Sequence, residues 1–362
     1  MTSIQSPAAS PTARLSGFED LAARHRALLA DEPNLRRRNA AERLGVSELD
    51  LLLAGGDGAV SQRLRPEFKD ILARVPTLGP VMVLTRNDSI VHEKTGPYNA
   101  PSFDGMVGLV LGEAIDLRIF LWHWAHAVAA TETSPRGARR SLHFFDKAGG
   151  ALHKIYLVEG SDPGAFDALT AAFLLHDPAP LALEALAPAK VPLPDSDIDQ
   201  AGFIAGWDAL QDTHEFHGLL TKFKLARQQA LRLAGEARAR PVAPTALRTV
   251  LTAAAEAETP IMVFVGNPGI IQIHTGPVKK LLEMGPWFNV MDPDFNLHIF
   301  EPTITHAWVV YKPTADGVVT SLELFDAQET LVASLFGKRK PGQAEDSAWR
   351  ALVAALPTLG AQ

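Results

Sequence analysis

The sequence predicts an α+β fold that is built from a tandem structural repeat, and two observations carry this prediction. The first is that residue n matches residue n + 180 without a gap over a long stretch, as Pro80 matches Pro260 and Asn87 matches Asn267. The second is that each copy has helical spacing first and strand-like alternation after it. A fixed offset that keeps turn residues indicates one fold occurring twice, with helices followed by a large antiparallel sheet in each copy.

The first copy begins with helices and continues with strands. Within residues 17–53, apolar residues such as Leu21 and Leu28 recur at helical spacing. From about residue 81 to residue 158, alternating and β-branched runs bounded by Gly, Pro and Asn predict several antiparallel strands. Residues 165–173 then predict a helix. The second copy follows the same order. We expect helices at 203–256, strands at 261–336 and a final helix at 344–356.

We expect four segments along the chain. Residues 1–16 are polar and read as a disordered tail, and residues 17–175 form the first repeat, or N-terminal lobe. Residues 176–200 carry five prolines and no clear periodicity, which is typical of a linker. Residues 201–362 form the second repeat, or C-terminal lobe.

The composition excludes several kinds of chemistry. The 362 residues are 47% hydrophobic and 21% charged, as in an ordinary globular protein. The absence of cysteine excludes disulfides, a thiolate nucleophile and Cys-ligated metal centres. The net charge of −7 argues against nucleic-acid binding, which depends on neutralising phosphates. We therefore expect any cofactor to be held non-covalently, by His, carboxylate, Tyr or packing.

The chain shows no signal for a membrane. It has no run of 18 or more apolar residues, so we expect no membrane insertion. Its N-terminus lacks the positive stretch and apolar core of a secretory signal. Together these observations predict a cytoplasmic protein.

His214 lies on the polar side of a predicted helix. The apolar stripe of this helix is made of Phe216, Leu219, Leu220 and Phe223. His214 falls about 160° from Phe216, nearly opposite the stripe, which disfavours a role in the helix's own core. Two interpretations remain: a solvated histidine, or a neutral imidazole that faces a cleft and ligates a metal or haem iron. At an offset of about 191 between the helices of the two copies, its counterpart is Ala23, so the first copy lacks this histidine.

His217 follows one turn later, at a spacing that allows two histidines to chelate a metal. The run His-Glu-Phe-His is one residue shorter than the zinc-protease pattern, and no third ligand lies nearby. We therefore interpret His217 as an alternate ligand rather than as half of a two-histidine metal site.

Residues 36–50 allow a competing interpretation as a helix-turn-helix. Small residues are followed by Leu-Gly-Val-Ser and then by a second predicted helix, which is the order of elements in that motif. A DNA-reading helix is basic or amide-rich at its start, whereas this one carries Glu48 and Asp50, which phosphates repel. A structural helical turn is therefore favoured.

Five stretches of the chain carry a resemblance to a known family. Three carry the match: Asp-Thr-His-Glu-Phe at 212–216, Ala-Arg-Gln-Gln-Ala at 226–230 and Asn-Pro-Gly-Ile-Ile-Gln-Ile-His-Thr-Gly-Pro at 267–277. Leu-Thr-Arg-Asn at 84–87 and Gly-Glu-Ala-Ile-Asp-Leu-Arg at 112–118 complete the pattern. Over most of its length the chain resembles the cytoplasmic hemin-degrading or haem-trafficking factors of Gram-negative haem-uptake systems.

The resemblance implies stacked antiparallel sheets flanked by helices, and one non-covalent haem b in a cleft of the second half. It implies that His214 is the axial ligand of the haem iron, with Arg118 on the opposite, distal side and Phe120 as a distal aromatic. The residues agree, because Asp116 to Phe120 alternate as in a strand and put Arg118 and Phe120 on one face. An exposed strand arginine and an ordinary core phenylalanine remain the alternatives.

The resemblance also implies partners for the acidic groups of the haem. Lys312 and Arg339 match basic residues that pair with the haem propionates, although solvated cations remain the alternative. Phe336 stands where relatives often carry Tyr, so a phenolic hydroxyl is lost there. His92 matches a position where some relatives hold a second haem, a question that the sequence leaves open.

Functions of different classes follow from the resemblance. In the favoured one, the protein is a carrier that holds haem and serves a haem oxygenase, the inner-membrane haem transporter, or both. In the alternative, it is an oxygenase-like enzyme that opens the haem ring, with Arg118 as a distal catalytic residue. No flavin or nicotinamide motif is present, so its electrons would come from outside. A third possible function is that of a haem-responsive regulator.

Overall fold

A computed structural model describes residues 11–134, 137–188, 191–339 and 342–359. The chain divides into two compact units that are not the two halves of the sequence. The second unit takes the chain from Pro188 onward and, in addition, the short segments Leu84–Gly96 and Leu111–Arg118. The rest of the chain up to Ala187 forms the first unit. Within the described residues, no helix is long and apolar enough to cross a membrane.

The first unit has helices, then strands, as the sequence predicts. Its helices are α1 (Pro11–Asp31), α2 (Arg37–Leu44), α3 (Glu48–Ala54), α4 (Phe68–Arg74), α5 (Pro163–Phe173) and the short 3-10 turns η1 (Val75–Leu78) and η2 (Leu121–His123). Its strands are β1 (Val60–Leu64), β2 (Pro80–Arg86, which continues into the second unit), β4 (Ser102–Asp104), β5 (Val107–Val110), β7 (His126–Ser134), β8 (Gly137–Phe145) and β9 (Ala151–Leu157). The hydrogen-bonded order is β1-β7-β8-β9-β2, and β4 pairs with β5.

The N-terminal end of this unit differs from the sequence expectation. Helix α1 begins at Pro11, five residues before the expected end of the tail at residue 16, and proline is well suited to the first turn of a helix. Residues 1–10 of that tail lie outside the described residues.

The turn between α2 and α3 is structural. Gly45 ends α2 in the left-handed region, and Ser47 caps α3 in a reciprocal capping box with Asp50. Glu48, the residue that argued against DNA binding, is buried and lies 3.1 Å from Nζ of Lys154 on β9. The start of α3 therefore packs on the protein's own sheet.

The second unit repeats this order of elements. Its helices are α6 (Gln200–Asp208), α7 (Glu215–Phe223), α8 (Arg227–Ala234), α9 (Ala246–Glu256), α10 (Ser347–Ala354) and the 3-10 turns η3 (Asp195–Asp197) and η4 (Glu301–Thr303). Its strands are β3 (Ile90–Pro97), β6 (Asp116–Phe120, which ends in the first unit), β10 (Ala239–Val242), β11 (Ile261–Asn267), β12 (Ile270–Gly276), β13 (Leu281–Met284), β14 (Trp287–Met291), β15 (Phe295–Phe300), β16 (His306–Thr314), β17 (Gly317–Phe325) and β18 (Leu331–Gly337).

Two antiparallel sheets stack within this unit, as the sequence analysis expects. One has the order β10-β16-β17-β18-β11-β12-β6, and the other has the order β3-β15-β14-β13. A single buried cluster joins them; it includes Val263 and Leu335 of the first sheet with Val290 and Leu297 of the second. Full burial of each such side chain stabilises the fold by roughly 1.5–3 kcal/mol. Two strands of this unit, β3 and most of β6, come from the first half of the sequence.

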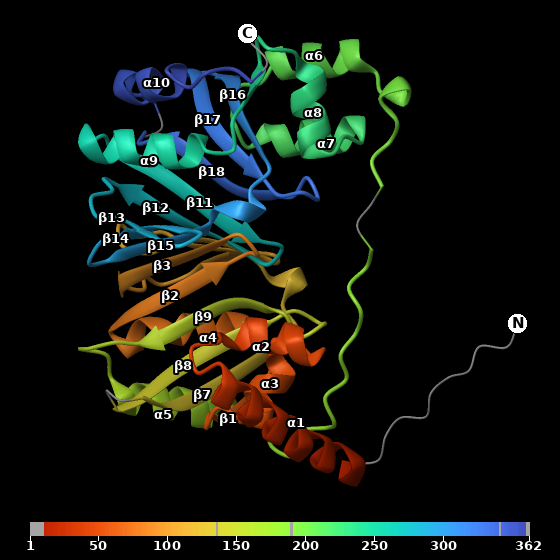
Figure 1. The fold of residues 1–362 in the computed structure, drawn as a ribbon, viewed down its shortest axis with the longest axis vertical. Coiled ribbons are helices and arrows are strands. Elements are labelled where there is room, and N and C mark those ends of the chain that lie inside the picture. Colours follow the sequence, from red (N-terminus) through yellow and green to blue (C-terminus); the bar gives the residue numbers. More distant parts are fainter. Residues whose placement is uncertain (1–10, 135–136, 189–190, 340–341, 360–362) are drawn as a thin grey trace, which may run out of the picture. The chain divides into compact units, whose positions relative to one another are not determined.

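Helices α6, α7 and α8 pack against the longer sheet. Their apolar side chains form a second cluster with sheet residues; its members include Trp207, Phe216 and Leu231 of the helices and Val310 and Phe325 of the strands. Figure 1 shows these three helices grouped beside β16 and β17. They therefore hold the segment around His214 against this sheet.

Buried polar side chains lie where the two sheets of the second unit meet. His92 of β3 is fully buried, and Nε2 of Gln272 lies 2.8 Å from its Nδ1. His274 of β12 stacks on Phe295 with the ring centres 3.7 Å apart. Burial, the charge of His274 and that of Lys94 hold the pKa of His92 well below its usual value. Because the His92 ring lies in the core, it presents no exposed edge to a second haem.

His274 makes the stability of this unit depend on pH. Burial is the main cause that lowers its pKa to about 4, whereas an unfolded chain has a histidine pKa near 6.5. Between these values the unfolded state binds a proton that the native state does not, so stability falls as the pH drops. We expect His274→Gln to remove ~3 kcal/mol of this pH dependence. Urea unfolding measured from pH 7 to pH 4 checks it. Substitution of the exposed His217 by Gln is the control. If the free energy of unfolding of His274→Gln changed with pH as in the wild type, His274 would not be the source of the pH dependence.

Candidate functional site

His214 stands at the start of α7, on its exposed side. It is the N-cap residue of this helix, and its side chain is 91% exposed. The apolar stripe of the helix is buried, with Phe216 1% exposed and Leu219 9% exposed. The prediction that His214 lies opposite this stripe is therefore confirmed, and its imidazole is accessible to a ligand. His217, one turn further along, is also exposed.

A carboxylate two residues earlier holds the imidazole. Oδ1 of Asp212 lies 2.6 Å from Nδ1 of His214 and accepts the backbone N–H of His214 at 2.8 Å. That backbone hydrogen bond is the main cause that keeps the pKa of Asp212 below its usual value, and the charge of Arg339 adds to the effect. Arg339 also lies 3.5 Å from Asp316 in the turn between β16 and β17. The structure thus gathers Arg339, Asp212 and His214 in one place.

A buried ion triad lies behind α7. Glu323 of β17 accepts hydrogen bonds from Arg227, the first residue of α8, at 2.7 and 2.8 Å, and from Nζ of Lys312 on β16 at 2.7 Å. Glu323 and Lys312 are 0% and 3% exposed. The ring of Phe216 packs over both cations, 4.6 Å from Nζ of Lys312 and 5.1 Å from the guanidinium carbon of Arg227. The triad therefore joins α7, α8 and the sheet two residues from His214.

Burial and charge oppose each other in this triad. Burial by itself would raise the pKa of Glu323, but the charges of Arg227 and Lys312 and their hydrogen bonds hold it well below its usual range. Burial lowers the pKa of Lys312, and the charge of Glu323 acts against this shift. Lys312, expected to pair with a haem propionate, therefore already has a carboxylate partner in this structure.

The same sheet carries a half-buried apolar face beside the triad. Met262 of β11 pairs with Phe336 of β18, and the rings of Phe264 and Phe336 meet edge to face with their centres 5.1 Å apart. Phe336 also pairs with Ser321 of β17, whose hydroxyl lies 3.2 Å from Glu323. Because register neighbours share one face of a sheet, these aromatic side chains lie on the triad's face.

Arg118 and Phe120 stand on β6 as the sequence predicts. The strand alternates, with Leu117 and Ile119 fully buried and Arg118 and Phe120 half-buried. The Arg118 guanidinium is ion-paired with Asp116, donates to the carbonyl of Leu117 at 3.2 Å, and is 31% exposed. Arg118 belongs to the second unit, where β6 lies beside β12, whereas Phe120 falls in the first unit. The structure thus puts Arg118, but not Phe120, in the unit that contains His214.

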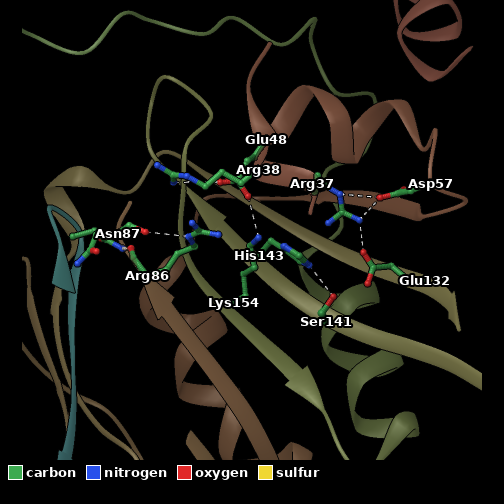
Figure 2. A network of polar contacts seen from close by, with 11 residues as sticks. Arg37, Arg38, Glu48, Asp57, Arg86, Asn87, Glu132, Ser141, His143 and Lys154 are labelled. Atoms are coloured by element: carbon green, nitrogen blue, oxygen red, sulfur yellow. Dashed lines mark hydrogen bonds and ion pairs between the residues drawn. The ribbon is translucent and has the colours of Figure 1, made fainter. Parts of the chain in front are cut away.

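The first unit contains a polar network related to the triad, but acidic and basic side chains stand at exchanged positions of the two repeats. Arg37, the first residue of α2, is ion-paired with Glu132 of β7, as Figure 2 shows. Glu132 stands 180 residues before Lys312, and the buried His143 stands 180 residues before Glu323. Both networks therefore anchor a helix arginine to the sheet. Only the second repeat has a carboxylate, Glu323, at the position where the first repeat has His143.

Two cavities of the described residues lie away from His214. One, of about 240 Å³, is lined in the first unit by residues of β1, β7 and α5, including Thr170. Another, of about 350 Å³, is lined in the second unit by residues that include Arg248 and Glu301. Neither is lined by His214 or Arg339. The chemistry of the side chains, rather than the size of a hollow, locates the candidate site.

No role for Asp212 or Glu323 was predicted from the sequence. A signal for Asp212 was available, because Asp side chains often accept the backbone N–H two residues further on. Glu323 lies between Leu322 and Leu324, and a carboxylate in an apolar strand indicates a buried partner. The partner itself, Arg227, is 96 residues away, so only the tertiary structure identifies it.

These features define a class of binding protein. An accessible imidazole suits a metal, a half-buried aromatic face suits a flat apolar ring, and neighbouring cations suit carboxylates. The donors present therefore fit a flat, metal-bearing ligand with acidic groups, and haem has this chemistry. The scaffold that carries them is an α+β tandem repeat with stacked sheets.

The sequence matches the haemin-degrading HemS.ChuX domain twice, at residues 45–173 and 224–356, so the chain belongs to this family. It is 39% identical to the hemin transport protein HmuS of Yersinia pestis over 328 residues, which are 90% of this chain and 94% of that protein. Holo-PhuS, a heme-binding protein from Pseudomonas aeruginosa, is 44% identical with a TM-score of 0.91, covering 94% of this chain and 99% of that one. The heme degrading enzyme ChuS of Escherichia coli O157:H7 is 36% identical with a TM-score of 0.87, at the same coverage. The double match confirms the tandem repeat.

The triad behind α7 predicts a large effect of one neutral substitution. Glu323→Gln leaves the buried Lys312 and the half-buried Arg227 without a countercharge, and loss of one partner from a buried ion pair destabilises a protein by about 3–5 kcal/mol. Chemical unfolding at pH 7 measures this loss. Asp208→Asn removes the same charge from an exposed pair with Arg238 and should cost no more than about 1 kcal/mol. Equal stability of the two variants would contradict the role given to the triad.

Proposed function

We propose that this chain is a cytoplasmic haem-binding protein of a bacterial haem-uptake and iron-acquisition system. It holds one haem b non-covalently through His214 and passes it on for degradation. The observation that carries the proposal is the accessible His214 imidazole, held by Asp212 at the start of a helix that packs on the triad. The names of the relatives, a hemin transport protein and a heme-binding protein, support the same ligand.

The side chains around His214 have distinct roles in this proposal. His214 ligates the iron, and His217 is an alternate ligand one turn away. Arg339 pairs with a propionate, which its 22% exposure and its place near Asp212 support. Lys312 serves the second propionate only if its ammonium is shared with, or released by, Glu323.

The remaining roles concern the haem ring and its distal side. Phe336 packs against the ring from the sheet, and its exposure on the triad's face supports this role. Arg118 and Phe120 act on the distal side, with Arg118 as the cation. Bound haem supplies an iron centre that can bind oxygen. Each of these side chains would bind, orient or shield the ligand.

We further propose how the chain is organised around this function. The N-terminal lobe, residues 17–175, and the C-terminal lobe, residues 201–362, are joined by the linker of residues 176–200. The C-terminal lobe ligates the haem, because the first repeat has no counterpart of His214. The partners are a haem oxygenase, the inner-membrane haem transporter, or both.

His214→Ala tests the proposal directly. The variant should lose the native Soret spectrum. Loss of an outer-shell partner of a metal ligand lowers metal affinity roughly 10–100-fold, and loss of the ligand itself should lower haem affinity by at least this factor. Haem titration followed by absorbance measures both quantities. His217→Ala is the matched control, because it removes an exposed imidazole from the same helix. Wild-type affinity and spectrum in His214→Ala would exclude His214 as the ligand.

A second candidate function is oxygenase-like opening of the haem ring. Two observations favour it: a relative is named a heme degrading enzyme, and a half-buried cation, Arg118, stands in the same unit as His214. The chain's own residues would then hold the haem and organise the distal side, while electrons come from an external donor.

One reaction separates the two functions. The ferric haem complex is supplied with reductant in the presence of catalase, which removes free peroxide that destroys haem without enzymatic control. For a carrier we expect catalase to suppress ring opening. Formation of one biliverdin isomer with CO, unaffected by catalase, would establish the enzyme, and Arg118→Ala should then lower the yield about tenfold or more. Chromatography of the pigment and CO detection are the measurements.

A further inference from the structure

Asp212 is the only hydrogen-bond partner of the His214 ring recorded in the described part of the chain, and its contact is short. The distance of 2.6 Å between Oδ1 of Asp212 and Nδ1 of His214 is that of a charge-assisted hydrogen bond. A carboxylate accepts and does not donate, so Nδ1 is the donor. The lone pair of the neutral ring then lies on Nε2, on the far side of the ring from Asp212.

The backbone that carries Asp212 is tied down at several points. Oδ1 of Asp212 also accepts the N–H of His214 at 2.8 Å. The carboxylate of Glu215 accepts the N–H groups of Gln211 and Asp212 at 2.8 and 3.3 Å. The N–H of Ala315, in the turn between β16 and β17, donates to the carbonyl of Gln211 at 2.9 Å. An exposed histidine is thus held by a loop that is fixed both to α7 and to the sheet.

We propose that Asp212 is a positioning residue for His214, an inference that rests on the proposed haem function. Asp212 presents Nε2 to the iron and, by its charge, strengthens the imidazole as a donor and favours ferric over ferrous haem. Outer-shell carboxylates act in this way on metal-bound histidines, because they fix the tautomer and raise the basicity of the ligand. A carrier gains from this device, since ferric haem is the form that does not bind oxygen.

The test compares the full-length haem complex of Asp212→Asn with that of the wild type. We expect ferric haem to lose about tenfold in affinity relative to ferrous haem. For a one-electron couple this corresponds to a midpoint potential about 59 mV higher. We also expect a lower iron–histidine stretching frequency in the resonance Raman spectrum of the ferrous complex. Spectroelectrochemistry and Raman spectroscopy therefore report on the ligand itself, which a merely structural role of Asp212 would leave unchanged.

Three further variants complete the test. Asp212→Glu keeps the charge and should recover part of the wild-type potential even if Asp212→Asn binds haem poorly. Asp208→Asn removes the same charge from an exposed side chain at the end of α6, which pairs with Arg238, and should leave potential and frequency at their wild-type values. Transfer of the iron to His217 in Asp212→Asn, seen as loss of the spectrum on adding His217→Ala, would also support positioning by Asp212.

The inference and the proposed function fail in different ways. Wild-type potential and Raman frequency in Asp212→Asn, with haem binding still abolished by His214→Ala, would overturn the inference and leave the function standing. Wild-type haem binding in His214→Ala would instead overturn the proposed ligand, whatever Asp212→Asn shows.

Discussion

The buried contact of Glu323 with Arg227 and Lys312 is the constraint on which the region around His214 depends. Glu323 and Lys312 are buried and Arg227 is half-buried, and the two buried charges are stable only with their partners, because each alone would bear the cost of desolvation. Their mutual attraction therefore fixes the start of α8 on the sheet, and Phe216 packs over both cations. Since His214 is two residues before Phe216, the ion triad helps to hold the exposed His214 imidazole in place.

The two repeats carry different polar side chains on one scaffold. Each anchors the first residue of a helix, Arg37 or Arg227, to a strand carboxylate, so the mechanical link between helix and sheet is kept. The acid stands at Glu132 in one repeat and at Glu323 in the other, and these are not equivalent positions. Both repeats can fold by the same packing rules, while only the second has a histidine at the start of the corresponding helix. Family membership and the accessible imidazole then agree on a single type of ligand.

The course of the chain limits how far the halves act independently. Strand β3 pairs with β15, and β6 lies beside β12, although β3 and β6 come from the first half of the sequence. A fragment that begins near residue 200 would lack both strands and expose the edges of β15 and β12, which are sites for unwanted pairing. Arg118 is carried into the second unit by this same exchange. The second unit is therefore built from residues of both halves of the chain.

The sequence by itself determined the repeat, the order of helices and strands, and the exposed side of α7 that carries His214, because periodicity and turn residues are local signals. It also indicated the alternation of Arg118 with its buried neighbours. Only the tertiary structure decided that β3 and β6 join the second unit, that Lys312 already has a carboxylate partner, and that His92 lies in the core. These outcomes depend on pairing and desolvation between residues far apart along the chain, and a local pattern contains no information about which distant charge or strand will be the partner.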